Sequence, residues 1–409
     1  MSVNLKDSLK EIYALYMYPA RFPAKIFDIF FSTINSRCPL FDPFSGSGSL
    51  ALASYLKGFD SIVWDLNPMI HVFVDAGLKL INGYSIGGVL VLIEKATSYG
   101  RPYLPEGAEY WWHQEGLDLI GKVWGFFRDN LASFNPATKE FEPYESSWSL
   151  FAVIALYASR RLSYSDDNVP KWYKSKLKVG KIMKELSEKA VEELFKHYVI
   201  KKAKDLCKTQ ERVSRPLCER EPAVMVKAVD AVTANEYPKD VAGVLTSPPY
   251  IQAQEYIRSF SWELRLLGVP ESTISELKKL EIPYRPPVGL EIQSATYHEV
   301  LDQIGEPKFK KLLESYFTNT LTVLEKAAEG IERGGIMGIF VGEATVRGKA
   351  IPTVKIMKEH LTNKLQMSEM SGMRIEDKIE RRRLFKKRKN LNPNGIEVEH
   401  LVFLRKDQN

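Results

Sequence analysis

Two short apolar runs near the start of the chain each end in small or polar residues. The first, residues 39–43, breaks into the glycine- and serine-rich residues 44–48, and an apolar stretch follows over residues 49–58. The second run, residues 61–64, ends in the sequence Asp-Leu-Asn-Pro of residues 65–68. Apolar runs of this length, bounded by turn residues, predict strands. The pattern predicts a strand, a loop, a helix and a second strand, which is one unit of a doubly wound α/β sheet.

The middle of the chain has a different pattern. From about residue 85 to residue 225 the apolar positions recur at helical spacing, and the segment is rich in Trp, Tyr, Lys and Arg. We expect loops at residues 135–143 and 163–170. We therefore interpret residues 85–222 as a mainly helical insertion, which interrupts an α/β domain formed by residues 1–84 and 223–409.

The spacing typical of strands returns after the insertion. We expect strands at residues 223–230, 240–245, 336–341 and 396–404; helices at residues 252–267 and 308–333; a proline-rich loop at residues 283–287; and turns at residues 334–335 and 392–395. The predicted fold class is α/β, Rossmann-like, with a mixed doubly wound sheet and a mainly helical insertion.

Composition adds little to this picture. The 409 residues, 44% hydrophobic and 26% charged, suit a large globular protein, and the net charge of +6 only weakly favours a polyanionic partner. The three cysteines form no paired framework and no Cys-x-x-Cys pattern, which indicates a reducing compartment. Because the start of the chain is polar and no apolar stretch reaches roughly 20 residues, we expect a cytoplasmic protein without membrane spans.

The segment Asp42-Pro43-Phe44-Ser45-Gly46-Ser47-Gly48 is suited to bind a nucleotide-like cofactor. Its glycines permit close approach of the backbone to a ligand, and the following helix begins with unpaired N–H groups. Asp65 ends the next strand about 20 residues later, where an acidic side chain can accept hydrogen bonds from ribose hydroxyls. No lysine of the P-loop type follows Gly48, which disfavours an NTPase.

A second segment, Thr246-Ser247-Pro248-Pro249-Tyr250, follows an apolar strand, and so belongs to the same edge of the sheet. The two prolines stiffen the loop and remove two N–H donors, which leaves its carbonyl groups as acceptors. An exocyclic amine could donate one hydrogen to the Ser247 hydroxyl and another to the Pro248 carbonyl, while Tyr250 stacks on the base. Taken alone, the segment could equally be a stiff turn.

With these two segments the chain resembles the amino-methyltransferases of nucleic acids, in particular the N4-cytosine branch of DNA methyltransferases. The first segment resembles motif I of that family, Ser247 to Tyr250 resembles motif IV, and Arg21-Phe22-Pro23-Ala24-Lys25 is similar to motif X. The resemblance implies a methyltransferase fold with S-adenosyl-L-methionine as cofactor, and no metal. The implied cofactor-binding residues are Arg21, Phe22, Pro23, Asp42, Pro43, Phe44, Ser45, Gly46, Gly48, Asp65, Leu66, Asp230 and Ala231. The implied catalytic residues are Ser247, Pro248, Pro249 and Tyr250.

The serine form of motif IV implies transfer of a methyl group to N4 of cytosine in DNA, as in a modification methylase with or without a separate cognate restriction endonuclease. Methylation at C5 of cytosine is disfavoured, because no cysteine nucleophile follows a proline: Cys38 precedes Pro39, and Cys218 is two residues beyond Pro216. Three alternatives remain open: an N4-cytidine methyltransferase of structured RNA such as ribosomal RNA, a binding protein that has lost catalysis, and a methyltransferase of small molecules or protein amides.

Contacts to nucleic acid are expected from two basic segments. An enzyme that acts on a duplex must flip the target base out, and we expect the insertion, as a target-recognition domain, to carry the groups that hold the duplex. The expected phosphate and base contacts are Arg160, Arg161, Tyr164, Lys171, Lys174 and Lys176 in the insertion, and Arg381, Arg382, Arg383, Lys386, Lys387 and Arg388 near the end of the chain. Such runs are also common on solvated surfaces, so this alternative stays open for both segments.

Overall fold

The computed structural model describes residues 5–18, 21–213, 220–251, 255–346, 349–365, 367–370, 375–378 and 398–407. The basic segment 381–388 and the expected turn at residues 392–395 lie outside these ranges.

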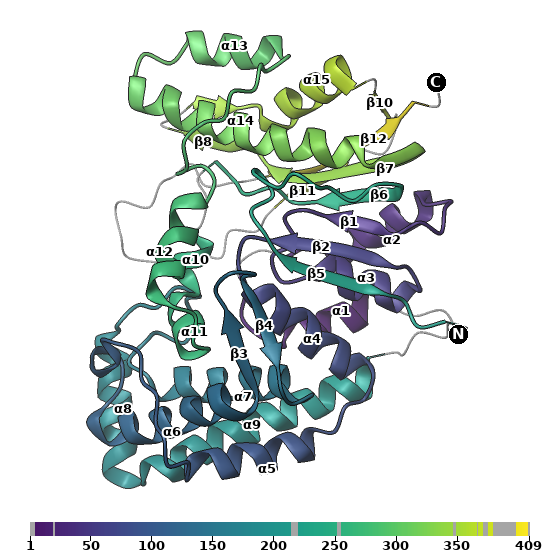
Figure 1. The fold of residues 1–409 in the computed structure, drawn as a ribbon. Coiled ribbons are helices and arrows are strands. Elements are labelled where there is room, and N and C mark those ends of the chain that lie inside the picture. Colours follow the sequence, from purple (N-terminus) through teal and green to yellow (C-terminus); the bar gives the residue numbers. More distant parts are fainter. Residues whose placement is uncertain are drawn as a thin grey trace.

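One large sheet organises the described residues (Figure 1). Its strands follow the order β5-β2-β1-β6-β7-β12-β10. Strand β11 also pairs with β12. The first five strands of this order are parallel, whereas β12 runs antiparallel to its neighbours. The strands span Leu40–Asp42 (β1), Ser61–Asp65 (β2), Val224–Ala228 (β5), Val241–Thr246 (β6), Ile331–Gly342 (β7), Met367–Glu369 (β10), Ile375–Lys378 (β11) and Val398–Lys406 (β12). The strand order reverses between β1 and β6, and in such sheets ligands bind outside the carboxyl ends of the strands at that point.

Helices cover both faces of the sheet, because alternate side chains of each buried strand point to opposite faces. Leu40 and Val63 belong to the apolar cluster under α1, α2 and α3, whereas their neighbours Phe41 and Trp64 belong to the cluster under α14 and α15. The helices outside the insertion span Leu5–Tyr13 (α1), Ala24–Thr33 (α2), Ser49–Lys57 (α3), Met69–Ile81 (α4), Tyr256–Ser259 (α10), Ser261–Leu266 (α11), Glu271–Leu280 (α12), Ala295–Asp302 (α13), Pro307–Glu329 (α14) and Thr353–Leu365 (α15).

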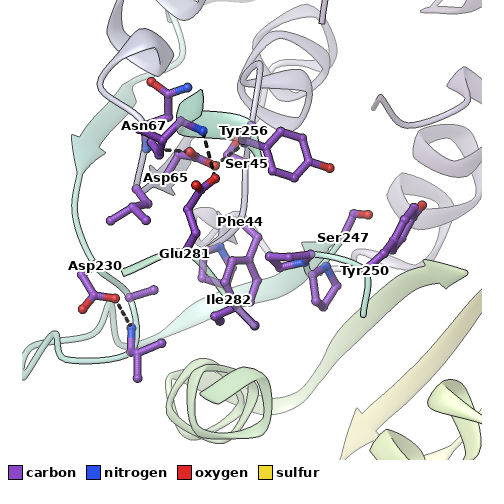
Figure 2. A pocket seen from close by; sticks show the side chains of 18 of the residues that line it. Phe44, Ser45, Asp65, Asn67, Asp230, Ser247, Tyr250, Tyr256, Glu281 and Ile282 are labelled. Atoms are coloured by element: carbon purple, nitrogen blue, oxygen red, sulfur yellow. Dashed lines mark hydrogen bonds between the residues drawn. The ribbon is translucent and has the colours of Figure 1, made fainter. Parts of the chain in front are cut away.

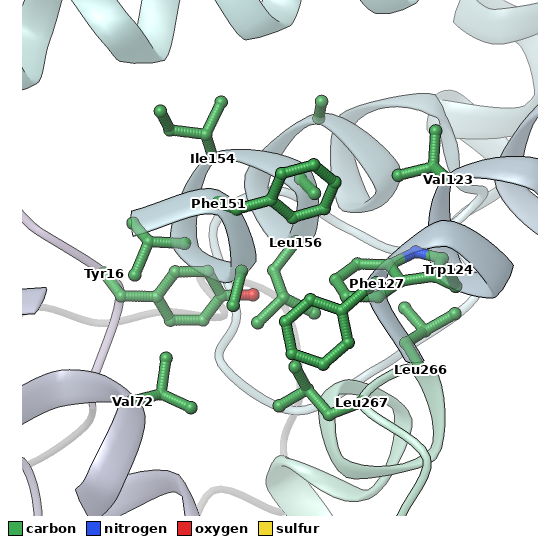
Figure 3. Packing of buried hydrophobic residues seen from close by; sticks show 14 of the residues in the cluster. Tyr16, Val72, Val123, Trp124, Phe127, Phe151, Ile154, Leu156, Leu266 and Leu267 are labelled. Carbon is green, nitrogen blue, oxygen red and sulfur yellow. The ribbon is translucent and has the colours of Figure 1, made fainter. Parts of the chain in front are cut away.

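The insertion forms a helical layer below the sheet in Figure 1. Its elements are α5 (Ile86–Thr97), the 3-10 helix η1 (Ala108–Tyr110), α6 (Gln114–Asn130), β3 (Ala132–Asn135), β4 (Glu140–Pro143), α7 (Trp148–Leu162), α8 (Lys176–Glu188) and α9 (Val191–Arg212). Its apolar interior is continuous with other segments: Val72 of α4 and Leu266 of α11 pack in the same cluster as Phe127 and Phe151 (Figure 3). The insertion therefore shares one core with parts of the chain on both sides of it.

The predicted fold class is confirmed: the sheet is mixed, doubly wound and Rossmann-like, and the insertion is mainly helical. The loop expected at residues 135–143 is instead part of the antiparallel hairpin β3–β4, whose Phe134 and Phe141 pack against one another. The helix expected at residues 252–267 is two short helices, α10 and α11, and residues 252–254 lie outside the described ranges.

The predicted end of the helix at residue 333 is also wrong. α14 ends at Glu329, and β7 begins at Ile331. The Gly334-Gly335 pair therefore lies inside a strand, where Gly334 adopts a φ of 76° and the register against β6 shifts between Val241 and Gly243. A glycine in a strand interior commonly marks such a bulge. None of the helices within the described ranges is long and apolar enough to cross a membrane.

Candidate cofactor and substrate cavity

A cavity of about 500 Å³ opens at the carboxyl ends of β1, β2 and β6, beside the point where the strand order reverses. This volume is in the range of small-molecule sites. Most of the residues expected from the sequence line it: Arg21, Phe22, Pro43, Phe44, Ser45, Gly46, Asp65, Leu66, Asp230, Ala231, Ser247, Pro248, Pro249 and Tyr250. Residues more than 200 positions apart in the chain thus meet at one cavity.

Three residues expected to bind the cofactor do not line the cavity. Pro23 lies at the start of α2. Gly48 precedes α3 with a left-handed φ of 77°, and a Cβ there would lie 2.2 Å from Cγ2 of Val74. Asp42 is fully buried, and burial raises the pKa of its carboxyl group to about 7. Gly48 and Asp42 therefore support the loops that form the cavity walls, without lining the cavity themselves.

The Asp42 carboxylate joins the two loops that carry the motifs. Its Oδ1 accepts a hydrogen bond of 3.0 Å from the Phe44 amide, at the start of the glycine-rich loop. The same oxygen accepts a hydrogen bond of 2.6 Å from the Thr246 hydroxyl, directly before Ser247. One buried side chain therefore fixes the position of both loops.

Asp65 holds the glycine-rich loop against β2. Its Oδ2 accepts a hydrogen bond of 2.8 Å from the Gly46 amide, and its Oδ1 accepts one of 2.8 Å from the Asn67 amide. Gly46 has a φ of 57°, and a Cβ there would lie 2.8 Å from the Tyr18 hydroxyl, so glycine suits both the conformation and the space. Burial raises the pKa of the Asp65 carboxyl group to about 6, although the two amide hydrogen bonds oppose this rise.

Asp230 lies at the far end of the cavity and is fully engaged. Its Oδ1 accepts hydrogen bonds from Arg285, at 2.6 Å, and from the amide of Val232, at 3.2 Å. Its Oδ2 accepts one of 2.7 Å from the hydroxyl of Thr233. Arg285 is itself buried, with 7% of its surface exposed, so the pair forms a fixed wall rather than a mobile charge. Arg285 was not expected from the sequence, because it lies in the proline-rich segment that was interpreted only as a loop.

The Ser-Pro-Pro-Tyr loop projects its two polar side chains to one side. Figure 2 shows Ser247 and Tyr250 next to one another at the edge of the cavity. The Tyr250 hydroxyl donates a hydrogen bond to the carboxylate of Glu399 on β12. Burial, followed by the charge of Glu399, raises the pKa of Tyr250 far above its usual value. Tyr250 is therefore a neutral, anchored ring at neutral pH.

Several lining residues were not expected from the sequence. Tyr18 and Tyr256 stack with their ring centroids 5.9 Å apart, and both rings line the cavity. Glu281 follows α12, and Glu399 is the second residue of β12. Tyr18 lies three positions before Arg21, where the segment similar to motif X begins, and could have been included among the expected lining residues. The two glutamates carry no local signal, because only the tertiary fold brings them to the cavity.

Four buried polar atoms of lining residues make no hydrogen bond within the described part of the chain: Ser45 Oγ, Asn67 Nδ2, Arg21 Nε and Arg285 Nε. The terminal nitrogens of Arg21 donate to the carbonyl groups of Tyr13 and Tyr16. Buried polar groups in folded proteins generally have partners. Unpaired donors and hydroxyl groups in a cavity wall are therefore the feature expected of a site that takes a polar ligand.

Arg160 and Tyr164, which were expected to contact nucleic acid, are buried. Arg160 forms an ion pair of 3.1 Å with Glu263 and donates to the carbonyl of Pro170 at 2.9 Å. Glu263, in turn, accepts hydrogen bonds from Tyr16, at 3.0 Å, and from Trp172, at 2.8 Å. The expectation for Arg160 is thus wrong, because its guanidinium group is buried, pairs with Glu263 and is unavailable to a phosphate.

The other expected contacts in the insertion differ in how free they are. Arg161 pairs with Asp167 at 3.0 Å, and Lys171 pairs with Glu255 at 3.1 Å. Lys174 lies over the rings of Tyr110 and Tyr164, at 4.3 and 4.9 Å from their centroids. Lys176 is exposed at the start of α8. The expected contacts Arg381, Arg382, Arg383, Lys386, Lys387 and Arg388 lie outside the described residues.

No protein-family model matches the chain, and no curated protein sequence matches it. Among solved structures, the chain is similar to an rRNA methylase from Streptococcus thermophilus, with 8% identity, a TM-score of 0.31, and coverage of 95% of this chain and 99% of that one. It is also similar to the rRNA methyltransferase aviRa from Streptomyces viridochromogenes, with 12% identity, a TM-score of 0.32, and coverage of 98% and 93%. Likenesses this distant carry no argument about function.

Proposed function

We propose that this chain is an S-adenosyl-L-methionine-dependent methyltransferase that acts on the exocyclic N4 amine of cytosine in DNA. The observation that carries the proposal is the hydrogen bond between Thr246 and Asp42, because it holds the Ser-Pro-Pro-Tyr loop and the glycine-rich loop at one cavity. A methyl donor and an amine acceptor must meet within bonding reach, and such positioning supplies much of the rate of a group transfer.

The cavity walls suit the parts of the cofactor. Asp65 would accept hydrogen bonds from the ribose hydroxyls, and the backbone beside Asp230 and Ala231 would lie along the adenine. Arg21 and Phe22, which also line the cavity, would contact the methionine end. Bound there, S-adenosyl-L-methionine would supply an electrophilic methyl group on a sulfonium sulfur. The unpaired Ser45 hydroxyl and Asn67 amide offer further partners to a ligand of this polarity.

The substrate amine would be held by the second loop. The Ser247 hydroxyl and the Pro248 carbonyl can each accept one of its hydrogens, which draws the nitrogen lone pair out of conjugation with the base. Tyr250, anchored through its hydroxyl to Glu399, would present its ring face to the flipped base. The anchoring fixes the ring before the substrate binds, so less conformational entropy is lost on binding.

The test is incubation of the protein with labelled methyl donor and with DNA and RNA in parallel, followed by mass spectrometry of the nucleosides. We expect N4-methyldeoxycytidine, and its loss in Ser247→Ala. Ser187→Ala, at an exposed position of α8, is the matched control and should keep full activity. Absence of N4-methyldeoxycytidine across DNA of varied sequence would contradict the proposal.

RNA is the second candidate polymer. The insertion exposes aromatic rings on its surface: 55% of Tyr110 and 52% of Tyr173 are accessible, and the Lys174 ammonium lies over the ring of Tyr110. Aromatic and basic side chains in this arrangement suit unstacked bases of single strands. Methyl incorporation into RNA alone would decide for this candidate. A separate cognate restriction endonuclease stays a prediction from the motif resemblance.

A further inference from the structure

Two acidic residues, Asp65 and Glu281, line the same cavity. Asp65 ends β2, and Glu281 directly follows α12, more than 200 positions later. Figure 2 shows the carboxylate of Glu281 directed at that of Asp65, and both residues line the cavity. Glu281 is 8% exposed. The chain therefore brings two acids into one poorly hydrated place.

Neither acid is neutralised by a basic side chain within the described residues. Among the described residues, Asp65 accepts hydrogen bonds from the backbone N–H groups of Gly46 and Asn67. Glu281 accepts the N–H of Ile257, near the start of α10, at 2.9 Å. The neighbouring acids behave differently: Asp230 pairs with Arg285, and Glu255 pairs with Lys171.

This arrangement is costly in the absence of a ligand. Burial raises the pKa of Glu281 to about 7, and the nearby charges of Glu255 and Asp65 add to the rise. Because the charges of two neighbouring carboxylates repel one another, each charge opposes ionisation of the other group. A ligand that donates hydrogen bonds to both would favour their charged forms and offset this cost.

The lone pairs left on the two acids suit adjacent hydroxyl groups. An ionised carboxylate has about four acceptor sites, and Asp65 already uses one on Oδ2 for Gly46 of the glycine-rich loop and one on Oδ1 for Asn67. A vicinal diol offers two O–H donors a short distance apart. With Asp65 alone, both would compete for the remaining sites of a carboxylate that also holds the loop. Glu281, which accepts the N–H of Ile257 and lines the same cavity, supplies further acceptor sites for a hydroxyl group.

We propose that Glu281 is a second diol acceptor, so that a ribose in this cavity is held by Asp65 and Glu281 together. The identity of the ribose as that of S-adenosyl-L-methionine rests on the proposed function, whereas the diol site itself does not. Glu281 is a ligand-binding residue that positions the sugar, and it takes no part in methyl transfer.

The test is calorimetric titration of the full-length chain with S-adenosylhomocysteine and with adenosine, followed by 2′-deoxyadenosine and 3′-deoxyadenosine. Glu281→Gln keeps an oxygen that can accept the Ile257 N–H, so the fold should survive; thermal unfolding checks this. We expect both ribose ligands to bind about tenfold more weakly to Glu281→Gln. For the deoxy ligand that lacks the hydroxyl bound by Glu281, wild type and variant should bind alike.

Glu271→Gln, at the opposite end of α12, is the matched control and should bind every ligand as wild type does. Glu281→Asp, which shortens the side chain by one methylene, is a second variant with the charge retained, and should also weaken ribose binding. The inference is wrong if both Glu281 variants fold and bind adenosine as tightly as wild type, even when S-adenosylhomocysteine binds well.

The two proposals fail in different ways. If adenosine binds and depends on Glu281 while S-adenosylhomocysteine does not bind, the diol site stands and the cofactor assignment falls. If S-adenosylhomocysteine binds with equal affinity to wild type and to both Glu281 variants, the cofactor assignment stands and the diol site falls. If neither ligand binds the wild-type chain, both proposals are overturned.

Discussion

The hydroxyl of Thr246 donates a hydrogen bond of 2.6 Å to Asp42, and so ties the carboxyl end of β6 to that of β1. Both side chains are fully buried. The first strand leads into the loop expected to face the cofactor, and the sixth leads into the loop expected to hold the amine. The relative position of the two loops therefore depends on one contact between neighbouring strands.

Replacement of Thr246 by valine should test this contact. The variant keeps the shape of the side chain but leaves Asp42 Oδ1 with one partner fewer. We expect the free energy of unfolding to fall by about 1–3 kcal/mol, measured by urea titration, and methyl transfer to fall with it. Thr362→Val removes a hydroxyl that bonds only to carbonyl groups of its own helix, at 3.0 and 3.2 Å. Equal losses in the two variants would contradict a special role for Thr246.

The contribution of Asp42 to the stability of the protein should fall as the pH rises from about 4 to about 8. Burial raises the pKa of Asp42 to about 7, well above its usual value of 3.8. In that interval the folded chain binds more protons than the unfolded chain, so the stabilisation present at low pH is lost as the pH rises through 7. Unfolding of wild type and Asp42→Asn at pH 5 and pH 8 measures the effect.

The decrease in stability between these two pH values should be smaller in Asp42→Asn than in wild type. Asp118→Asn, at a position whose side chain is 66% exposed, should keep the wild-type decrease. A decrease as large in Asp42→Asn as in wild type would show that the buried carboxyl group is not its source.

Tyr250 should contribute through its ring more than through its hydroxyl. Tyr250→Ala removes the stacking face, so we expect substrate binding to weaken by about 1–3 kcal/mol, measured as the dissociation constant for nucleic acid and as kcat/KM. Tyr250→Phe keeps the ring and loses only the bond to Glu399, so its effect should be smaller. Tyr144→Ala, at a position 60% exposed on the insertion, serves as control. Undiminished activity in Tyr250→Ala would rule out the stacking role.

Arg160 and Lys176 should separate a structural role from a binding role. Arg160→Met leaves the buried Glu263 charge without its partner, so we expect a loss of about 3–5 kcal/mol of unfolding free energy. Lys176→Met should leave stability unchanged and, if the exposed ammonium contacts a phosphate, should reduce the slope of log K against log salt by about 1. Arg160→Met that folds normally but loses affinity would restore the original expectation for Arg160.

Gly48 should not tolerate a side chain. Gly48→Ala places a Cβ in a left-handed conformation and against Val74, so we expect a loss of more than about 1 kcal/mol. Gly88→Ala, on the exposed face of α5 with no atom within 4 Å, should instead stabilise the chain by about 0.5–1 kcal/mol. Chemical denaturation of both variants decides whether space and conformation, rather than glycine content, explain Gly48.

The parts of the site that the sequence predicts are those fixed by local rules. Asp65 and the glycine-rich loop follow short strands, and parallel strands bring their carboxyl ends to one edge, so their meeting with Ser247 could be expected. Glu281, Arg285 and Glu399 reach the cavity only through the packing of distant segments, and nothing near them in the sequence indicates it.

The failures have the same origin. Arg160 has the same local sequence character as an exposed arginine, and only the position of Glu263, 103 residues later, shows that it is buried. The hairpin β3–β4 was missed because its strands contain few apolar residues, and its pairing depends on the contact between Phe134 and Phe141. At Gly334-Gly335, turn chemistry was correctly recognised, but strand pairing with β6 turns it into a bulge.

The apolar cluster that joins α4, α7 and α11 has a consequence for how this protein can vary. A chain from which residues 85–222 were removed would leave the faces of Val72 and Leu264 without cover, because both are fully buried against the insertion. The insertion is therefore not an independent domain that could be exchanged without changing the packing of the rest of the chain. A change of side-chain volume in its interior therefore alters the packing of α4 and α11 as well.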